Sequence, residues 1–281
     1  AALPGWAAAD IDTRLMLLME GLDRLYRHHL FTLVHAVMHT AGQSYNMAYA
    51  GSGVNALDRG IEALVYAEQA MRAVTPQVRW ARRFGPDEIT LDKTYRLIPR
   101  GVAVCFTCAS FATWNAWPSI LASLATGNAV IVKPHPASVL PMAITVRVFR
   151  ELLAERGVDP NLITLCLDTT ADPLGKVLIK HPDCAIVDFT GSARFGKWVE
   201  SNAHPAIAFT ETSGCNTVVL AGAEDLDAAI RALATTMCMF SAQMCTSPQN
   251  VYLPPVIDTP NGPVPRDVVA QKLADAIAAL V

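Results

Sequence analysis

Residues 129–136 read AVIVKPHP, and residues 185–192 read AIVDFTGS. Each stretch begins with an apolar, partly β-branched run and ends in Pro, Gly or Ser, which is the pattern of a short buried strand followed by a turn. Apolar residues at helical spacing follow the first stretch over 138–156, and a glycine ends them. The two stretches therefore predict strands that end at Lys133 and Phe189, with a helix after the first strand.

The same alternation continues on both sides of these stretches. Further strands are predicted over 104–107 and 162–167, and a helix over 174–180. Strands that alternate with helices through short loops form a parallel sheet, so the predicted fold class is α/β with a doubly wound parallel sheet. Because such sheets bind ligands at the carboxyl ends of their strands, residues 133–136 and 190–192 are the places to seek chemistry.

The first hundred residues carry a different pattern. Apolar residues at near-helical spacing predict helices over 10–40 and 55–74. Residues 84–97 are more polar and contain turn residues, which favours a hairpin or arm between the two blocks. A helical block therefore precedes the α/β region.

Composition excludes several classes of protein. Hydrophobic residues make up 52% of the 281 residues, enough for a large core, and 22 Lys and Arg against 25 Asp and Glu give a net charge of -3. Since neither sign forms a long run, nucleic acid and anionic membranes are poor partners. No segment reaches the roughly 18 consecutive apolar residues of a membrane span, so a cytoplasmic protein is expected.

The seven cysteines are an odd number and lie mostly within apolar runs. This distribution predicts reduced thiols rather than a disulfide framework. Cys105 and Cys108 have the spacing of a metal-binding pair, but no second pair of cysteines or histidines accompanies them at zinc-like spacing. We therefore expect two cysteines of a strand and no metal site.

Three features could carry chemistry. The turn 190–192 lies between a predicted buried strand and a helix, where glycine allows close backbone approach and free amides attract phosphate. Cys245 lies in a predicted loop, where a thiol can be exposed and reactive. Glu211 follows an apolar run and is a candidate general base. Taken singly, each of these signals is weak, because such residues also occur for purely structural reasons.

Five short motifs occur together over residues 95–253, and their order and spacing are far more specific than any one of them. They are Trp114-Asn115, Gly127 to Pro134, Phe189-Thr190-Gly191-Ser192 with Gly196, Glu211 with Gly214 and Asn216, and Gln243-Met244-Cys245. In this arrangement the chain resembles the aldehyde dehydrogenase superfamily. Within it, residues 99–101, 113–115, 133–136 and 243–246 look closest to the phenylacetic acid degradation proteins of the PaaN type.

The resemblance implies an NAD(P)-dependent oxidation of an aldehyde to a carboxylic acid through a cysteine thioester. It assigns the attack on the aldehyde carbon to Cys245. The side chain of Asn115 and the backbone N–H of Cys245 would hold the oxyanion, and Glu211 would activate the water that hydrolyses the thioester.

The resemblance also implies cofactor contacts. They fall on Trp114, Lys133, Pro136, Gly191, Ser192 and Gly196. In NAD-preferring relatives the position three residues after the lysine is commonly glutamate, and here it is Pro136. Because proline does not repel the 2′-phosphate of NADP, NADP or NAD is expected, with NADP slightly favoured.

Two domains are implied in the same way. Residues 1–212 would form the NAD(P)-binding domain, with the helical block and with a hairpin or oligomerisation arm at about 85–100. Residues 213–281 would begin a catalytic domain that is truncated at Val281. The resemblance further implies a homo-oligomer, a dimer or tetramer, acting on a small aldehyde. A semialdehyde of phenylacetate or aromatic catabolism, free or CoA-linked, is the expected substrate class.

Two alternatives stay open. A CoA-acylating aldehyde dehydrogenase is favoured by residues 133–136, since acylating relatives often show a similar Pro-His-Pro. A non-catalytic nucleotide-binding scaffold on the same fold is favoured by departures from the family pattern. These departures are Thr212, Ser213 and Cys215. Acylating relatives usually lack a glutamate such as Glu211, and a scaffold has no use for it beside Cys245, so the hydrolytic enzyme leads.

Overall fold

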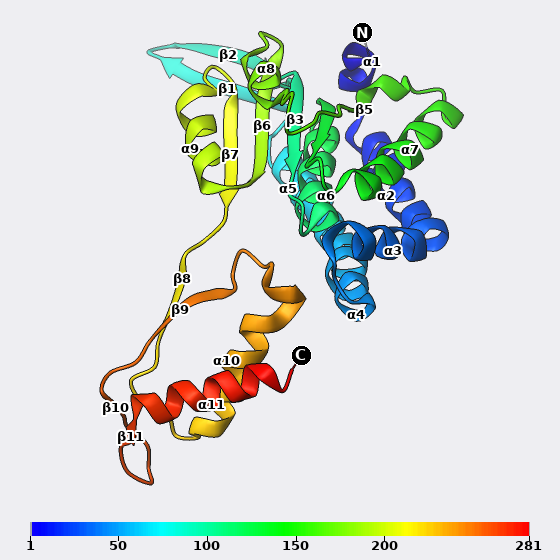
Figure 1. The fold of residues 1–281 in the computed structure, drawn as a ribbon. Coiled ribbons are helices and arrows are strands. Elements are labelled where there is room, and N and C mark those ends of the chain that lie inside the picture. The colour runs from blue at the N-terminus through cyan, green and yellow to red at the C-terminus, as the bar shows by residue number, and fades with distance from the viewer. Residues whose placement is uncertain (1, 281) are drawn as a thin grey trace.

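The computed structural model describes residues 2–280 and contains a five-stranded parallel sheet. The strand order is β5-β4-β3-β6-β7. The strands are β3 (Val102–Thr107), β4 (Ala129–Pro134), β5 (Ile163–Leu165), β6 (Cys184–Gly191) and β7 (Ile207–Thr212). The chain moves outward from β3 in one direction and then returns to the other side, as a doubly wound sheet does (Figure 1). The predicted fold class is confirmed.

The sheet has a core on each face, because successive side chains of a strand point to opposite sides. In β3, Ala103 and Cys105 belong to a large core, while Val104 and Phe106 belong to a smaller one. The large core is built with helices α6 (Ala112–Ala125) and α7 (Val139–Glu155). The smaller core lies under α8 (Gly175–Lys180) and α9 (Ala193–Asn202). The continuous apolar runs of the strands are explained by burial on both faces.

A helical block completes the large core. Its elements are α1 (Leu3–Ala8), α2 (Ile11–Arg24), the π-helical turn η1 (Leu25–His29), α3 (Leu30–Ala41), α4 (Tyr45–Met47), the π-helical segment η2 (Ala48–Val54) and α5 (Asn55–Arg72). Two buried side chains tie it to the end of α6: the Trp6 indole donates to the Leu124 carbonyl at 2.8 Å, and Arg14 Nε donates to the Ala125 carbonyl at 2.9 Å. Burial lowers the pKa of Arg14. The two predicted helices match α2 to α3 and α5.

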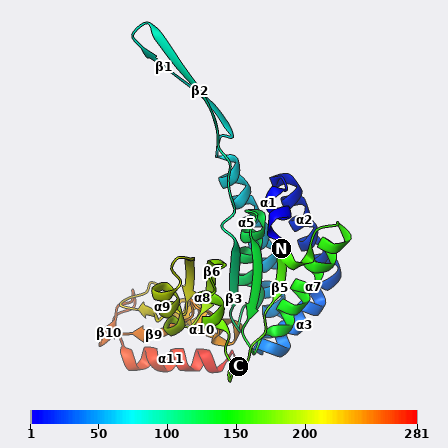
Figure 2. The same cartoon turned by 90° about the horizontal axis from the view of Figure 1, so that it is seen from above.

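An antiparallel hairpin extends away from the rest of the molecule (Figure 2). It consists of β1 (Gln77–Phe84) and β2 (Asp87–Thr94). The predicted arm began at residue 84, but its first strand begins at Gln77. Of the sixteen side chains in the two strands, all except the partly buried Trp80 are exposed. The basic side chains Arg79, Arg82 and Arg83 therefore lie on an exposed strand.

After Thr212 the chain leaves the five-stranded sheet (Figure 1). The remaining elements are β8 (Asn216–Val219), α10 (Leu226–Cys238), the 3-10 turn η4 (Met239–Ala242), β9 (Pro248–Tyr252), β10 (Val256–Ile257), β11 (Val264–Pro265) and α11 (Arg266–Ala278). They enclose a small core of their own around Ile230, Ile257 and Val269. The domain boundary between residues 212 and 213 stays a prediction. None of the helices within residues 2–280 has the length and apolar character needed to cross a membrane.

Candidate functional site

The carboxyl ends of the parallel strands surround a cavity of about 640 Å³. Its lining includes Thr107 at the end of β3, Lys133 in β4 and Gly191 at the end of β6. The loop after β5 adds Asp168, and the start of α8 adds Gly175. Sequence reasoning expected ligand chemistry at these strand ends, and the fold gathers them around one space.

Lys133 and Asp168 form a buried ion pair in this cavity. The ammonium nitrogen lies 2.6 Å from Asp168 Oδ1, and the two side chains are only 11% and 2% exposed. Asp168 Oδ2 accepts a hydrogen bond from the backbone N–H of Leu174 at 3.0 Å. Lys133 is therefore not a free cation. Sequence reasoning missed Asp168, although an acidic residue directly after the predicted strand 162–167 was an available signal.

One polar atom of the cavity lining lacks a hydrogen-bond partner. Thr107 Oγ1 is buried without one, whereas Asp168 Oδ1 is engaged by the Lys133 ammonium at 2.6 Å. Because buried polar atoms usually find partners, the Thr107 hydroxyl is suited to a ligand that carries a hydroxyl group. The cavity thus offers the Thr107 hydroxyl, the Lys133 side chain and the backbone at Gly191. These groups suit the sugar and phosphate groups of a dinucleotide.

Two glycines, at the end of β6 and in the first turn of α9, leave no room for a larger side chain. A Cβ on Gly191 would lie 2.7 Å from the Phe189 ring, so glycine keeps this turn flush with the cavity. Ser192 begins α9, and its hydroxyl accepts from the Phe195 N–H at 3.4 Å. A Cβ on Gly196 would lie 2.4 Å from Thr212 Cγ2. Gly196 therefore brings α9 close to β7 and is not part of the cavity wall.

A second, smaller cavity of about 270 Å³ contains the three predicted catalytic residues, Asn115, Glu211 and Cys245. Asn115 comes from the first turns of α6, Glu211 from the end of β7 and Cys245 from the loop before β9. The Asn115 side-chain amide donates to Glu211 Oε2 at 2.9 Å. Residues separated by 96 and 34 positions in the sequence thus line one space. The two cavities adjoin, because Cys108, Thr190 and Gly191 line both.

The loop that carries Cys245 has unusual backbone geometry. Phe240, Ser241 and Ala242 have φ angles of 54°, 57° and 57°, in the left-handed region that side chains with a Cβ disfavour. The Phe240 ring packs edge-on against Phe111, with centroids 4.9 Å apart. Backbone strain of this kind concentrates at functional sites.

Two side-chain amides hold this loop in place. Gln243 Nε2 donates to the Ala41 carbonyl at the end of α3, at 2.8 Å. Asn216 Nδ2 donates to the Cys245 carbonyl at 2.6 Å and to the Ser247 carbonyl at 3.2 Å. Asn216 was quoted in the sequence only as part of a motif, and its contact with the Cys245 loop depends on the pairing of β8 with β9.

Exposure separates Cys245 from most other cysteines. Burial raises the pKa of the Cys105, Cys108, Cys166 and Cys184 thiols, which keeps them protonated. Cys245 and Cys215 are exposed. Cys215 lies just before β8, and its sulfur accepts a hydrogen bond from Asn250 Nδ2 at 3.5 Å. Cys215 does not line the small cavity, so Cys245 is the exposed thiol beside Asn115 and Glu211.

Three predicted cofactor residues lie outside both cavity linings: Gly196, described above, Trp114 and Pro136. Trp114 packs against the large core and meets Phe111 edge-on at 6.5 Å. Pro136 is partly buried beyond the end of β4, and its neighbour His135 lines the large cavity instead. Burial and the nearby Lys133 lower the pKa of His135. Within residues 2–280, no cluster of side chains could hold a metal ion.

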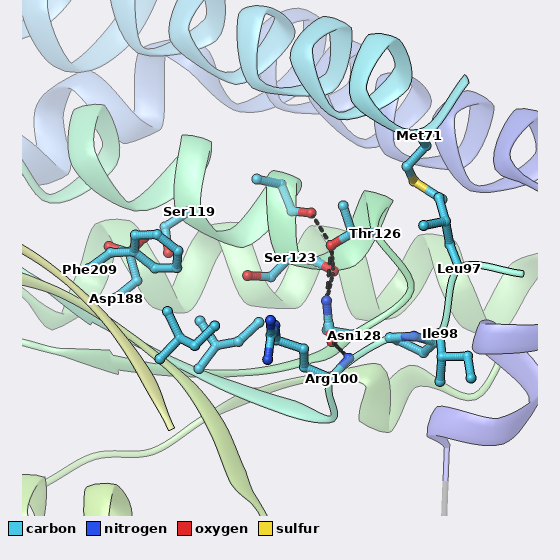
Figure 3. Close-up of a pocket in the computed structure, with 14 residues that line it drawn as sticks. Met71, Leu97, Ile98, Arg100, Ser119, Ser123, Thr126, Asn128, Asp188 and Phe209 are labelled. Atoms are coloured by element: carbon cyan, nitrogen blue, oxygen red, sulfur yellow. Dashed lines mark hydrogen bonds between the residues drawn. The ribbon is translucent and has the colours of Figure 1, made fainter. Parts of the chain in front are cut away.

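A third cavity, of about 480 Å³, lies on the α6 side of the sheet and contains none of the predicted site residues (Figure 3). Asn128 lines it, and its Oδ1 accepts from the backbone N–H groups of Arg100 and Gly101 at 2.8 and 3.0 Å. Asp188 also lines it, and burial raises its pKa to about 6. This cavity is separate from the carboxyl ends of the strands.

The family comparison agrees with this geometry. A model described as "Aldehyde dehydrogenase family" matches residues 1–258. The chain belongs to the aldehyde dehydrogenase family. A curated relative, aldehyde dehydrogenase LUC3 of a Fusarium species, is 28% identical over 254 residues, which are 90% of this chain and 49% of the relative.

Solved structures give the same result. An NAD-dependent aldehyde dehydrogenase from Burkholderia multivorans is 40% identical with a TM-score of 0.95, covering 100% of this chain and 50% of that one. An NADP-dependent glyceraldehyde-3-phosphate dehydrogenase from Bacillus halodurans, solved with NADP, has a TM-score of 0.77 at 20% identity and covers 100% of this chain and 54% of that one. The second likeness concerns the fold alone. The chain spans about half the length of these relatives.

Proposed function

We propose that this chain provides the cofactor site and the nucleophile of an NAD(P)-dependent aldehyde dehydrogenase. The observation that carries the proposal is the small cavity in which Asn115, Glu211 and Cys245 meet beside the larger cavity at the strand ends. The residues of the larger cavity would hold the cofactor. When bound there, NAD(P) supplies the acceptor for the hydride that leaves the substrate carbon.

The exposed Cys245 thiolate begins the proposed reaction by attacking the aldehyde carbon, which forms a C–S bond and places a negative charge on the former carbonyl oxygen. The Asn115 amide has two N–H donors, and one of them already binds Glu211. The second N–H is available to stabilise the oxyanion. Loss of hydride from the carbon then leaves an acyl thioester on Cys245.

Glu211 would act in the second half of the reaction. Its carboxylate takes a proton from a water molecule, and the hydroxide attacks the thioester carbonyl. The C–S bond breaks, the carboxylic acid leaves and the Cys245 thiolate is restored. The hydrogen bond from Asn115 orients Glu211 in the same cavity as the sulfur, which favours hydrolysis over acyl transfer to CoA. His135, the residue that suggested a CoA-acylating enzyme, lines the other cavity.

Within this class we propose a semialdehyde of aromatic or phenylacetate catabolism as the substrate, on the resemblance of residues 99–101, 113–115, 133–136 and 243–246 to the PaaN type. The exposed hairpin β1-β2 supports a role as an oligomerisation arm, since Phe84, Ile89 and Leu91 are about half exposed. A homo-oligomer with this arm at its interface is therefore part of the proposal.

Product analysis tests the proposed reaction. The protein is incubated with an aromatic semialdehyde and NAD(P), with and without CoA. We expect free carboxylic acid in both mixtures and equal rates of cofactor reduction. Formation of an acyl-CoA only in the presence of CoA would replace the hydrolytic proposal with the acylating one, and no cofactor reduction with any aldehyde would favour a scaffold. Labelling of Cys245 by iodoacetamide distinguishes a reactive thiol from an inert one.

A further inference from the structure

The third cavity shares no lining residue with the two cavities at the strand ends. On its helix side, Ala122 and Ser123 follow Ser119 by three and four positions, so these small side chains share one face of α6. On its sheet side, Ile186 and Asp188 alternate along β6 and point to the same face of the sheet. A space of about 480 Å³ remains between them, within the range of small-molecule sites (Figure 3).

Two polar side chains in this cavity are without partners. Ser119 is only 7% exposed, and its Oγ has no hydrogen-bond partner. The Asp188 carboxyl lies beside it, because the Ser119 hydroxyl is close enough to lower the pKa of that carboxyl. Within residues 2–280, no Lys, Arg or His nitrogen lies within 4.0 Å of the Asp188 oxygens.

The electrostatic potential at this part of the cavity is negative. Burial raises the pKa of Asp188 to about 6, and the nearby Glu211 carboxylate also raises it. The carboxyl is therefore mostly ionised at pH 7.5, although a charge in a poorly solvated place is costly without a counter-ion. Arg100 is the only basic residue among the described lining residues; its side chain is exposed, and its charge does not shift the pKa of Asp188.

An organic ammonium ion suits these groups. Its N–H donors can bind the Asp188 carboxylate and the Ser119 hydroxyl oxygen, which satisfies both. Its carbon skeleton would meet the apolar side chains of Ile186, Ile207 and Phe209, which line the same cavity. Phe209 is the direct neighbour of Asp188 across β6 and β7, so its ring can also contact a cation held by the carboxylate.

We propose that the third cavity is a binding site for a small organic ammonium ion, an alkyl- or arylalkylamine in its protonated form, held by Asp188 and Ser119. An anion would meet the carboxylate, and a neutral alcohol would leave the carboxylate without a counter-charge. The proposal does not depend on the proposed function, because it uses neither the cofactor cavity nor the cavity of Cys245.

Direct binding tests the proposal without any turnover. The probes are 2-phenylethylammonium and its neutral counterpart 2-phenylethanol, titrated separately and followed by ligand-observed NMR at pH 7.5. The variants are Asp188→Asn, which removes the charge and keeps the shape, and Asp172→Asn as a matched control. Asp172 is exposed and does not line the cavity, so its substitution makes the same change in net charge elsewhere.

We expect the unmodified protein to bind the amine at least roughly tenfold more tightly than the alcohol, the effect of about one favourable charge contact. Asp188→Asn should bring the ratio near unity, and Asp172→Asn should leave it unchanged. Ser119→Ala should weaken amine binding roughly threefold, as expected for one lost hydrogen bond. Amine affinity in the unmodified protein should also rise from pH 5 to pH 7.5, because the carboxyl loses its proton while the amine keeps its own.

Equal affinities for amine and alcohol in the unmodified protein, or binding of neither, would overturn the proposal. An unchanged ratio in folded Asp188→Asn would overturn it as well. If Asp188→Asn does not fold, an amine affinity that stays constant between pH 5 and pH 7.5 is the contradicting result. Unchanged amine binding in Ser119→Ala would overturn the placement of the ammonium between the two side chains.

Discussion

The side-chain amide of Asn115 donates a hydrogen bond to Glu211 Oε2 at 2.9 Å, joining the start of α6 to the end of β7. One polar side chain from a helix start and one from a strand end are thereby fixed in the cavity that Cys245 lines. The contact links the proposed oxyanion donor with the proposed general base, so a change in either residue should affect both halves of the reaction to different degrees.

Glu211→Gln should slow thioester hydrolysis much more than the first half-reaction. The amide cannot take a proton from water but can still pair with Asn115, and loss of a general base typically costs 10²- to 10⁴-fold. Stopped-flow absorbance should show a rapid burst of reduced cofactor followed by a slow steady state. Glu224→Gln, at an exposed position outside the cavity, is the control. Unchanged steady-state turnover in Glu211→Gln would remove this residue from the mechanism.

Cys245→Ala should abolish aldehyde oxidation while dinucleotide binding, measured by calorimetry, stays within about twofold. The thiol forms the bond to substrate but lies outside the large cavity. Cys215→Ala is a matched control, because Cys215 is also exposed and lies outside the small cavity. Near-normal turnover in Cys245→Ala, or an equal loss in Cys215→Ala, would contradict the assignment of the nucleophile.

Gly51→Ala should disturb the Cys245 loop through the Phe240 ring. A Cβ on Gly51 would lie 2.6 Å from Phe240 Cε1 and 3.2 Å from Phe111 Cε1, so the Phe240 ring must move. Because Phe240 is the first of three residues with positive φ before the nucleophile, kcat/KM should fall roughly ten- to hundredfold.

Gly5→Ala serves as the comparison for Gly51→Ala, because Gly5 is also helical and a Cβ there meets nothing within 4 Å. Its kcat/KM should be unchanged, and its stability equal or slightly higher, since alanine favours a helix over glycine. Equal kcat/KM in the two variants would show that the packing of Phe240 does not position Cys245.

Asp188→Asn should make stability depend less on pH. The pKa of Asp188 is raised from 3.8 to about 6, chiefly by burial, so this carboxyl is protonated in the folded state under conditions where it ionises in the unfolded chain. Its contribution to stability is therefore greatest below about pH 4 and falls as pH rises to about 6. The loss is about 1 to 3 kcal/mol, reduced by the partial exposure of the side chain.

Urea unfolding at pH 4.5 and pH 7.5 checks this expectation. The free energy of unfolding of Asp188→Asn, relative to that of the unmodified protein, should be higher at pH 7.5 than at pH 4.5. Asp172→Asn, at an exposed site, should show a smaller dependence. The same stability difference at both pH values would show that Asp188 ionises alike in the folded and unfolded chains.

The local elements were predictable because their signals are local. The apolar runs before Lys133 and Phe189 each form a strand, and the helical spacing over 138–156 gives α7. The predicted hairpin started too late in the sequence, because β1 already begins at Gln77. Nearly all side chains of β1 are exposed, so its sequence lacks the alternation of apolar and polar residues that marks a half-buried strand. Motif spacing also identified Asn115, Glu211 and Cys245 as a candidate set.

The sequence by itself determined the α/β class, the strand order along the chain and the residue types that carry the proposed chemistry. Only the tertiary structure decided which of them meet. Asp168 pairs with Lys133, Gly196 faces Thr212 instead of a cofactor cavity, and Pro136 lies outside it. The physical reason is that strand and helix patterns depend on neighbouring residues, whereas contacts between loops depend on how strands are ordered in the sheet. Because β4 and β5 pair in parallel, their carboxyl ends lie side by side although a long connection separates them in the sequence. The sequence pattern predicts each strand but not which strands become neighbours.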